Sequence, residues 1–441
     1  MMIRARVLLS LLAMLPAMFL VNCQGYKCGG FGALPCSSTG TGTSGTGGGS
    51  SAAVFAYAVD TSAVTMDGYA LNTKAGTFSA IPNYTAPPIP DSEPGVGMVI
   101  AQGQFVYAAF EAAGGSIYGW SVDSTTGALT ALAPVDLTLL APTGLAFNQY
   151  NLATNPAGTL LFVSDTELDE IFVFQISSPT SATPGALTLV PGSPVTTPIG
   201  FEPGNLATDG LGNYLYVTES LGADTHSGGT LLLAYTIGTG ANLGVLTPVT
   251  GSPFTLPVAM WQVQGDPSGN FLIGTSGNNQ DFTGLDDLHL YVFSIQPLTG
   301  TAPGAIAQVP NSPFITKYSP FNIAVQPTST GGEFVYSFSI NDSDTAYYPI
   351  EGFQLNITSG ALTELTNSPF GSTTTPTGLG HWGQFDQSGA FLFVYSSSLV
   401  SGVTATQLGV WNVGSAGVLT LSTITPAALK TPGYWAVTDP Q

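Results

Sequence analysis

The sequence has very few basic residues. Among 441 residues there are 6 Lys and Arg against 26 Asp and Glu, so the formal net charge is −20 at pH 7. No Arg follows Arg6. Such a chain repels nucleic acid and anionic membranes, and it lacks the guanidinium groups that grip phosphate with two hydrogen bonds. We therefore expect no nucleic-acid partner and a neutral or cationic ligand.

Cysteine is also scarce, and all 3 cysteines stand before residue 37. The long remainder therefore has neither a Cys nucleophile nor a disulfide. It also lacks a G-x-S-x-G elbow, an H-E-x-x-H pair and a phosphate-binding loop. These absences exclude the commonest hydrolase and nucleotide-binding motifs.

Residues 1–22 have the features of an export signal. Arg4 and Arg6 precede the apolar run Val7–Val21, which is short for a membrane span, and Cys23 follows directly after Asn22. The arrangement resembles a bacterial lipoprotein signal, although that pattern has Gly, Ala or Ser where Asn22 stands. The resemblance implies lipidation of Cys23 and a place in the periplasm or on the outer cell surface. The alternatives are an ordinary secretory signal and an uncleaved anchor.

Residues 23–51 are interpreted as a tether. Ser37–Ser51 contains only Ser, Thr and Gly, which favours a flexible chain. If Cys23 carries lipid, Cys28 and Cys36 remain as a disulfide pair in an oxidising compartment. The folded body is then residues 52–441.

A repeat dominates this body. Ser193, Ser252, Ser312 and Ser368 follow one another at intervals of 59, 60 and 56 residues, and each lies in a Gly-Ser-Pro or Asn-Ser-Pro exit. Each unit contains four short runs rich in β-branched and aromatic residues, with Gly, Pro or Asn between them. The pattern predicts an all-β array of four-stranded antiparallel meanders.

The two ends of the body complement each other. Six units begin inside the chain, near residues 98, 151, 205, 262, 322 and 382. A seventh beginning, Trp435–Pro440, has no continuation, whereas Val54–Val59 and Gly68–Ile81 are strands without a beginning. Pairing the C-terminal strand with the N-terminal strands predicts a closed seven-bladed β-propeller, which leaves no long sheet edge. An open β-solenoid is the alternative.

The motifs resemble those of the seven-bladed propeller lactonases. The resemblance is carried by the turns Thr126–Thr130 (TGALT) and Ser359–Thr363 (SGALT), the SPF exits, and P-x-G-x-x-L-x-V strand beginnings. The best-known members of that family act on 6-phosphogluconolactone, and a related branch cyclises carboxymuconate. The resemblance covers about Ala52 to the C-terminus and specifies the scaffold better than the chemistry.

Inner strands of a propeller converge on its axis, so the residues at their starts are expected to form a ring. These positions are rich in aromatic and amide side chains, which suit a neutral polyol, sugar lactone or peptide. The alternative is that the amides satisfy backbone groups and the aromatics fill the axis. The expected ligand-binding residues are Tyr150, Asn151, Asn205, Trp261, Gln262, Phe321, Asn322, Trp382 and Trp435.

The resemblance is most informative in the fourth blade. Active relatives carry an Arg-His pair before the inner strand and a Glu after the next strand. Here Gly204 and Asn205 replace the pair, whereas Glu219 is retained. A lactonase needs a base for water and a group that stabilises the oxyanion. The resemblance therefore implies Glu219 as base, while the cation is missing.

The other candidate acid–base groups are histidines and loop acids. His226, near Glu219, and His381, at the ring, are further catalytic candidates, whereas His289 is interpreted as structural. Acidic runs in the loops between second and third strands are interpreted as solvated, so no metal ligand set and no required cofactor is predicted, although Ca²⁺ or another divalent ion is compatible with them. The runs are Asp165, Glu167, Asp169 and Glu170; Asp281, Asp286 and Asp287; and Asp342 and Asp344.

Two hypotheses follow from these residues. In the first, an exported monomer hydrolyses an unphosphorylated sugar lactone, with Glu219 as base and Asn205, Gln262, Asn322 and His381 orienting the substrate. In the second, a non-catalytic propeller holds glycan or peptide at the cell surface. In both, only an N-terminal lipid anchor touches the membrane.

Overall fold

The computed structural model describes most of the folded body. The described residues are 54–60, 63–72, 77–90, 94–110, 115–140, 150–220, 228–276, 287–327, 333–339, 350–371, 382–400, 403–422, 427–429 and 435–438. Cys23, Cys28 and Cys36 lie outside them, as do His226 and His381. Among the described residues, no helix is both long enough and apolar enough to cross a bilayer.

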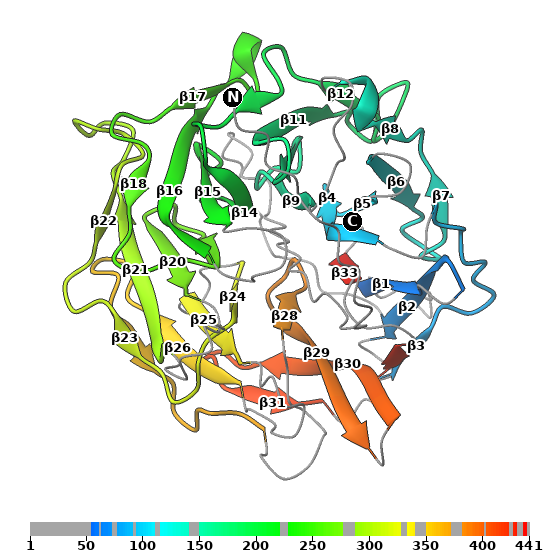
Figure 1. The fold of residues 1–441 in the computed structure, drawn as a ribbon. Coiled ribbons are helices and arrows are strands. Elements are labelled where there is room, and N and C mark those ends of the chain that lie inside the picture. The colour runs from blue at the N-terminus through cyan, green and yellow to red at the C-terminus, as the bar shows by residue number, and fades with distance from the viewer. Residues whose placement is uncertain are drawn as a thin grey trace, which may run out of the picture.

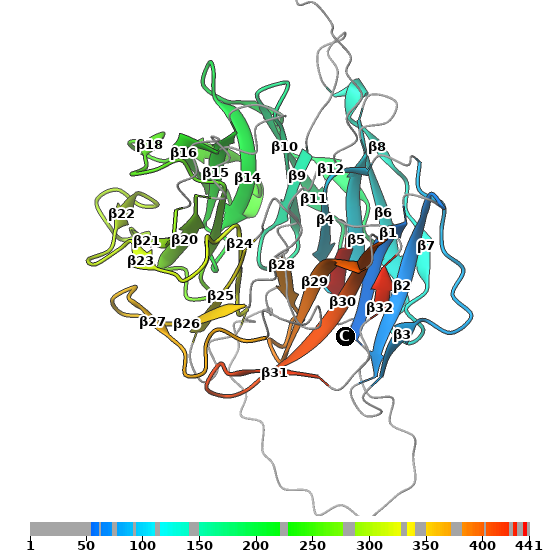
Figure 2. The same cartoon turned by 60° about the horizontal axis from the view of Figure 1, so that its bottom comes forward.

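The fold is a seven-bladed β-propeller, as the repeat predicts (Figure 1). Each blade is an antiparallel sheet whose innermost strand lies near the axis and whose outer strands lie at the rim. Figure 2 shows the same blades in a tilted view. One side of the disc is called the ring face. On this side the inner strands begin, and the second and third strands are joined.

The inner strands come from seven different parts of the chain, and consecutive inner strands contact one another around the axis. They are β33 (Trp435–Thr438), β4 (Pro94–Ala101), β9 (Tyr150–Thr154), β14 (Glu202–Thr208), β19 (Gln262–Gly265), β24 (Asn322–Val325) and β28 (Trp382–Phe385), for blades 1 to 7 in that order.

The second strands follow them outward. They are β1 (Val54–Asp60), β5 (Phe105–Phe110), β10 (Leu160–Asp165), β15 (Tyr214–Ser220), β20 (Phe271–Thr275), β25 (Glu333–Phe338) and β29 (Phe391–Val400). The third strands are β2 (Thr65–Asn72), β6 (Ser116–Val122), β11 (Glu170–Ile176), β16 (Gly228–Ile237), β21 (His289–Ile295), β26 (Glu351–Leu355) and β30 (Val403–Val413).

The fourth strands are short. They are β3 (Thr77–Ala80), β7 (Leu129–Ala131), β12 (Leu187–Leu189), β17 (Leu246–Pro248), β22 (Ile306–Gln308), β27 (Leu362–Glu364) and β31 (Leu419–Leu421). The 3-10 helices η2 (Leu137–Leu139) and η3 (Gly240–Asn242) lie in connections.

Five blades have a fifth strand that the sequence did not reveal. It is only two or three residues long and pairs with the third strand beside the fourth. These strands are β8 (Val135–Asp136), β13 (Val195–Thr196), β18 (Phe254–Thr255), β23 (Phe314–Ile315) and β32 (Ala427–Leu429). The predicted four-stranded unit is therefore correct but incomplete.

The repeated serines explain why the exits recur at regular intervals along the chain. Each Ser Oγ accepts a hydrogen bond from a backbone N–H of the third strand in its own blade, at 2.8–3.1 Å. The donors are Val173 for Ser193, Ala234 for Ser252, Val292 for Ser312 and Gly352 for Ser368. The serine side chain thus accepts a hydrogen bond from the third strand, which is the strand that the exit segment pairs with.

The C-terminal strand closes the ring. β33 is the innermost strand of blade 1 and pairs with β1, with Tyr57 opposite Ala436 and Ala58 opposite Trp435. In Figure 1 the red β33 lies beside the blue β1. The complementary ends of the sequence predict this pairing correctly.

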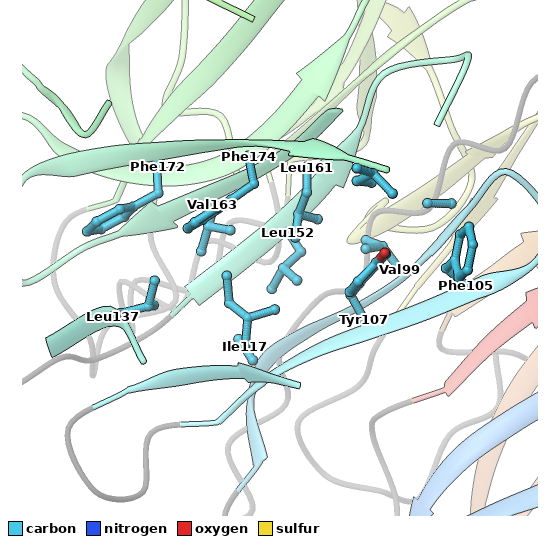
Figure 3. Close-up of a cluster of buried hydrophobic side chains, with 13 residues drawn as sticks. Val99, Phe105, Tyr107, Ile117, Leu137, Leu152, Leu161, Val163, Phe172 and Phe174 are labelled. Carbon is cyan, nitrogen blue, oxygen red and sulfur yellow. The ribbon is translucent and has the colours of Figure 1, made fainter. Parts of the chain in front are cut away.

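The hydrophobic core lies between the blades. Seven clusters of buried side chains occupy the described residues, and each is built by two neighbouring blades. In the cluster of Figure 3, Val99, Tyr107 and Ile117 of blade 2 face Leu161 and Phe172 of blade 3. Because alternate residues of a strand point to opposite faces, every blade interior is apolar on both sides.

The turn after each third strand, seen as GALT in the sequence, fits against the next interface. Gly127 of blade 2 has φ +72°, and a Cβ on it would lie 2.5 Å from the ring of Phe55 in blade 1. The Gly127 carbonyl accepts the hydroxyl of Tyr57 at 2.7 Å. Glycine therefore supplies both the left-handed backbone and the space for an aromatic ring.

Removing the closing strand tests the ring. Deletion of residues 434–441 leaves the backbone of β1 unpaired on its inner side. We expect the thermal unfolding midpoint to fall by about 10 °C or more, since several strand hydrogen bonds and a blade interface are lost. Circular dichroism melting measures it, and an unchanged midpoint would refute closure by β33.

The Ser-Pro exits give a second prediction. In Ser252→Ala the buried N–H of Ala234 loses its acceptor, and we expect a loss of about 1–3 kcal/mol in the free energy of unfolding. Ser178→Ala is the control, because Ser178 is exposed, and it should change this free energy by less than about 0.5 kcal/mol. Equal denaturant midpoints for both variants would contradict the structural role of Ser252.

Candidate functional site

The inner strands begin where the sequence places the ring. β9, β19, β24, β28 and β33 start at Tyr150, Gln262, Asn322, Trp382 and Trp435. Phe321 and Asn322 are buried, whereas Trp261 and Asn151 are half-buried. The placement of the ring positions is therefore as expected, while ligand binding by them remains a prediction.

Blade 4 departs from this regularity, as does blade 2, in which β4 shifts register between Pro94 and Met98. β14 begins earlier, at Glu202, and its pairing with β15 shifts register between Pro203 and Leu206. Gly204 and Asn205, which stand where the relatives carry Arg-His, thus lie in a β-bulge. The Asn205 N–H donates to Thr218 Oγ1 at 3.0 Å. Bulges re-aim side chains and are frequent beside active sites.

The bulge is held from the neighbouring blade. Ser164 Oγ, at the end of β10, donates to the Gly204 carbonyl at 2.9 Å, and Thr166 Oγ1 donates to the Pro203 carbonyl at 3.0 Å. Blade 3 therefore fixes the backbone on which Asn205 is mounted.

The ring amides connect neighbouring inner strands. Asn205 Oδ1 accepts the N–H of Val263 at 3.2 Å, and Gln262 Oε1 accepts the N–H of Ile323 at 2.8 Å. Each amide oxygen thus accepts a hydrogen bond from the next blade, which sets the orientation of the amide and leaves the NH₂ group as its donor. Asn205 is 4% exposed, and its Nδ2 has no hydrogen-bond partner. An unpartnered donor of this kind can serve a carbonyl oxygen or an oxyanion.

Glu219 lies on the strand paired with the bulge. It lies opposite Pro203 in β15, one residue after Thr218, which accepts the Asn205 N–H. Its Oε2 accepts the N–H of Leu231 at 3.2 Å, and the carboxylate lies over Gly229, where a Cβ would be 1.8 Å from Oε2. Glycine at 229 therefore makes room for the acid.

A second acid, missed in the sequence, shares this edge. Glu202 begins β14, and burial raises its pKa above the ordinary range, with smaller contributions from the charges of Asp169, Glu167 and Glu219. The carboxylates of Asp169, Glu167 and Glu219 therefore lie within electrostatic reach of Glu202 on the ring face. Glu202 holds a proton more tightly than an isolated carboxylate does.

The aromatic residues of the ring pair across blades 5 and 6. The rings of Trp261 and Phe321 have centroids 5.4 Å apart and an interplanar angle of 33°. Trp261 retains partial exposure. The pair forms an apolar wall next to Gln262.

The remaining basic and histidine candidates lie elsewhere. His289 Nδ1 is 2.6 Å from Asp287 Oδ1, and Asp287 Oδ2 accepts the hydroxyl of Tyr291 at 2.9 Å. Lys317, the one Lys or Arg in the described part of the chain, pairs with Glu364 of β27 in the outer part of blade 6. His226 and His381 are outside the described residues.

Two of the four loop acids of blade 3 are buried, whereas the sequence predicted solvated acids; Glu167 is exposed and Asp169 half-buried. Asp165 is 0% exposed and Glu170 8%. They are the facing ends of the β10–β11 hairpin, and Glu170 also pairs with Thr196 of β13. A hairpin loop of four residues, TELD, places residues 165 and 170 opposite each other, so this arrangement was readable from the sequence. What could not be read was the pairing of Glu170 with the fifth strand.

No group of three His, Cys, Asp or Glu side chains that could hold a metal ion occurs within the described ranges. Asp281, Asp286, Asp342 and Asp344 fall in segments outside those ranges.

Comparison with known proteins gives a likeness at the level of structure alone. No family model matches the sequence, and no curated protein matches it. A protein from Lactobacillus plantarum aligns with a TM-score of 0.58 at 15% identity, covering 88% of this chain and 98% of its own. A proposed 6-phosphogluconolactonase from Bacteroides fragilis gives 0.57 at 16%, covering 88% and 98%.

A periplasmic gluconolactonase from Pseudomonas aeruginosa gives a TM-score of 0.55 at 13% identity, covering 85% of this chain and 97% of that protein. The protein therefore has the fold of the lactonase-type seven-bladed β-propellers, in agreement with the motif resemblance. At identities this low the comparisons establish the shared fold, and the chemistry has to be argued from the residues of the site.

The buried acids predict how stability depends on pH. Burial raises the pKa of Asp165 to about 7 and that of Asp209, which caps the β14–β15 turn, to about 6. The folded state then binds protons more tightly than the unfolded chain, so stability is highest at acidic pH and is lost as pH rises through these values.

We expect the thermal midpoint to be higher at pH 5 than at pH 8 in EDTA, and Asp165→Asn to reduce that difference. Asp123→Asn is the control, because backbone hydrogen bonds from Thr126 and Thr125 lower the pKa of Asp123. A wild-type midpoint that rises from pH 5 to pH 8 would contradict the prediction.

Proposed function

We propose that the protein is an exported lactonase that opens an unphosphorylated sugar lactone outside the cytoplasm. The observation that carries the proposal is the blade 4 bulge, which places Asn205, whose Nδ2 has no hydrogen-bond partner, and the acid Glu219 on adjacent strands at the ring face. The likeness to a periplasmic gluconolactonase supports it, as does the signal-like N-terminus.

The reaction needs two groups. Glu219, as its carboxylate, takes a proton from a water molecule as the water oxygen bonds to the lactone carbonyl carbon. Asn205 Nδ2 donates to the oxygen of that carbonyl, which becomes an oxyanion. When the ring C–O bond breaks, the leaving ring oxygen receives the proton from Glu219, so that the hydroxy acid is released.

The scarcity of basic residues points to the class of substrate. The sequence after Arg6 has no Arg, and Lys317, the one Lys of the described residues, is engaged by Glu364. The acids near Glu219 would repel a phosphorylated lactone. A neutral sugar lactone is compatible with these acids, with the amide NH₂ groups and with the aromatic wall of Trp261 and Phe321.

A non-catalytic surface propeller that binds glycan or peptide is the second candidate. One observation favours it. The side-chain oxygens of Asn205 and Gln262 accept backbone hydrogen bonds from the next blade, so these amides have a structural role even without catalysis.

Variants in blade 4 separate the two. With a panel of unphosphorylated aldonolactones, we expect turnover by the wild type to fall about 100-fold or more in Glu219→Gln and Asn205→Asp. Asp at 205 keeps an oxygen for the Val263 N–H but has no NH₂ donor. Glu202→Gln replaces another acid of the same edge with an uncharged amide, and it should keep activity within about threefold of the wild type.

Initial rates from the released acid, corrected for spontaneous opening, give the comparison, and melting checks that each variant is folded. Equal activity of wild type and Glu219→Gln would exclude Glu219 as the base. No turnover by the wild type, together with retained binding of a glycan, would support the second candidate.

A further inference from the structure

Two buried carboxylates face each other at the ring face of blade 3. Asp165 is the last residue of β10 and Glu170 the first of β11, and they are direct partners in the strand register. Residues opposite each other in an antiparallel pair project from the same face of the sheet with Cβ atoms about 5 Å apart. The two acids are therefore neighbours as well as buried.

Each of them has an oxygen without a partner. Asp165 Oδ1 accepts the N–H groups of Glu167 and Leu168, at 3.1 and 3.0 Å, whereas Asp165 Oδ2 and Glu170 Oε2 have no hydrogen-bond partner. Like charges directly opposite each other are destabilising, and a buried carboxylate without compensation is more costly still. Something must therefore neutralise the pair, and the choice is a proton or a cation.

The surroundings favour a cation. Glu167, in the hairpin loop, is exposed, Asp169 is half-buried, and Glu202 of blade 4 lies within electrostatic reach of both. Lys317, the one Lys or Arg among the described residues, lies in the connection from blade 5 to blade 6 and pairs with Glu364 of β27. Negative potential from several carboxylates raises the local concentration of cations.

We propose that Asp165 and Glu170 hold a divalent, oxygen-seeking cation of the Ca²⁺ class. The two orphan oxygens supply the charged ligands, and carbonyl oxygens and water supply the rest of the six to eight oxygens that Ca²⁺ takes. The site lies between β10 and β11, and it is independent of the lactonase proposal. Its role would be to lock the hairpin that carries Ser164 and Thr166, the two residues that hold the blade 4 bulge.

The test is calorimetric titration of Ca²⁺ into the full chain after EDTA treatment, at pH 7.5. We expect one saturable site with Kd about 0.1–1 mM, the range of extracellular calcium modules. In the double variant Asp165→Asn, Glu170→Gln the affinity should fall by about tenfold or more. The amides keep the shape of the side chains and remove the repulsion, so this variant should fold.

The matched control removes two charges elsewhere. Asp123→Asn combined with Asp136→Asn changes two exposed aspartates of blade 2, each of which accepts backbone N–H groups that Asn also caps. This variant should bind Ca²⁺ as the wild type does. Saturating Ca²⁺ should also raise the thermal midpoint of the wild type and of the control, but not that of the Asp165/Glu170 variant.

Three outcomes would overturn the proposal. They are the absence of a saturable site in the wild type, equal affinity in the Asp165/Glu170 variant, and stabilisation of the wild type by acid alone with no response to Ca²⁺. The last result would mean that the pair shares a proton.

Discussion

The structure depends on the packing of each blade between two others. All seven buried clusters span two blades, so that no blade has a core of its own. Blade 1 cannot bury both of its faces unless the ring closes, and β33 supplies its innermost strand from the other end of the chain. Closure is therefore a requirement of the core, because an open array would expose an apolar sheet face at each end.

The same constraint shapes the candidate site. Side chains join the inner strands of neighbouring blades: the side-chain oxygens of Asn205 and Gln262 each accept a hydrogen bond from an N–H of the next blade. An amide has a second function, the NH₂ group, so one side chain can bind the ring together and still offer a donor. Hydroxyl groups of blade 3 fix the bulge of blade 4 from the side. The geometry of the site is thus a property of two blades at once.

The sequence predicts the scaffold well because its determinants are local and repeated. Strand runs, the glycine of the GALT turn and complementary ends give the blade number, the strand order and the closure. The contacts outside the regular four-strand ladder were not readable in this way. The acceptor role of Ser252, the fifth strand that pairs with Glu170 and the bulge at Asn205 join residues of one blade that the repeat pattern does not mark as partners. Glu219 was found through resemblance, whereas the partner groups around it needed the fold.

A neutral substrate is the central functional proposal, and it rests on an acidic edge at which the described residues include no Lys or Arg. The most direct measurement compares kcat/KM for one sugar lactone with that for its phosphorylated counterpart, using the same preparation at one ionic strength. We predict that the neutral lactone is preferred by about tenfold or more, since carboxylates near Glu219 oppose a phosphate group. Preference for the phosphorylated lactone would contradict the account, as would failure to open either lactone faster than water alone.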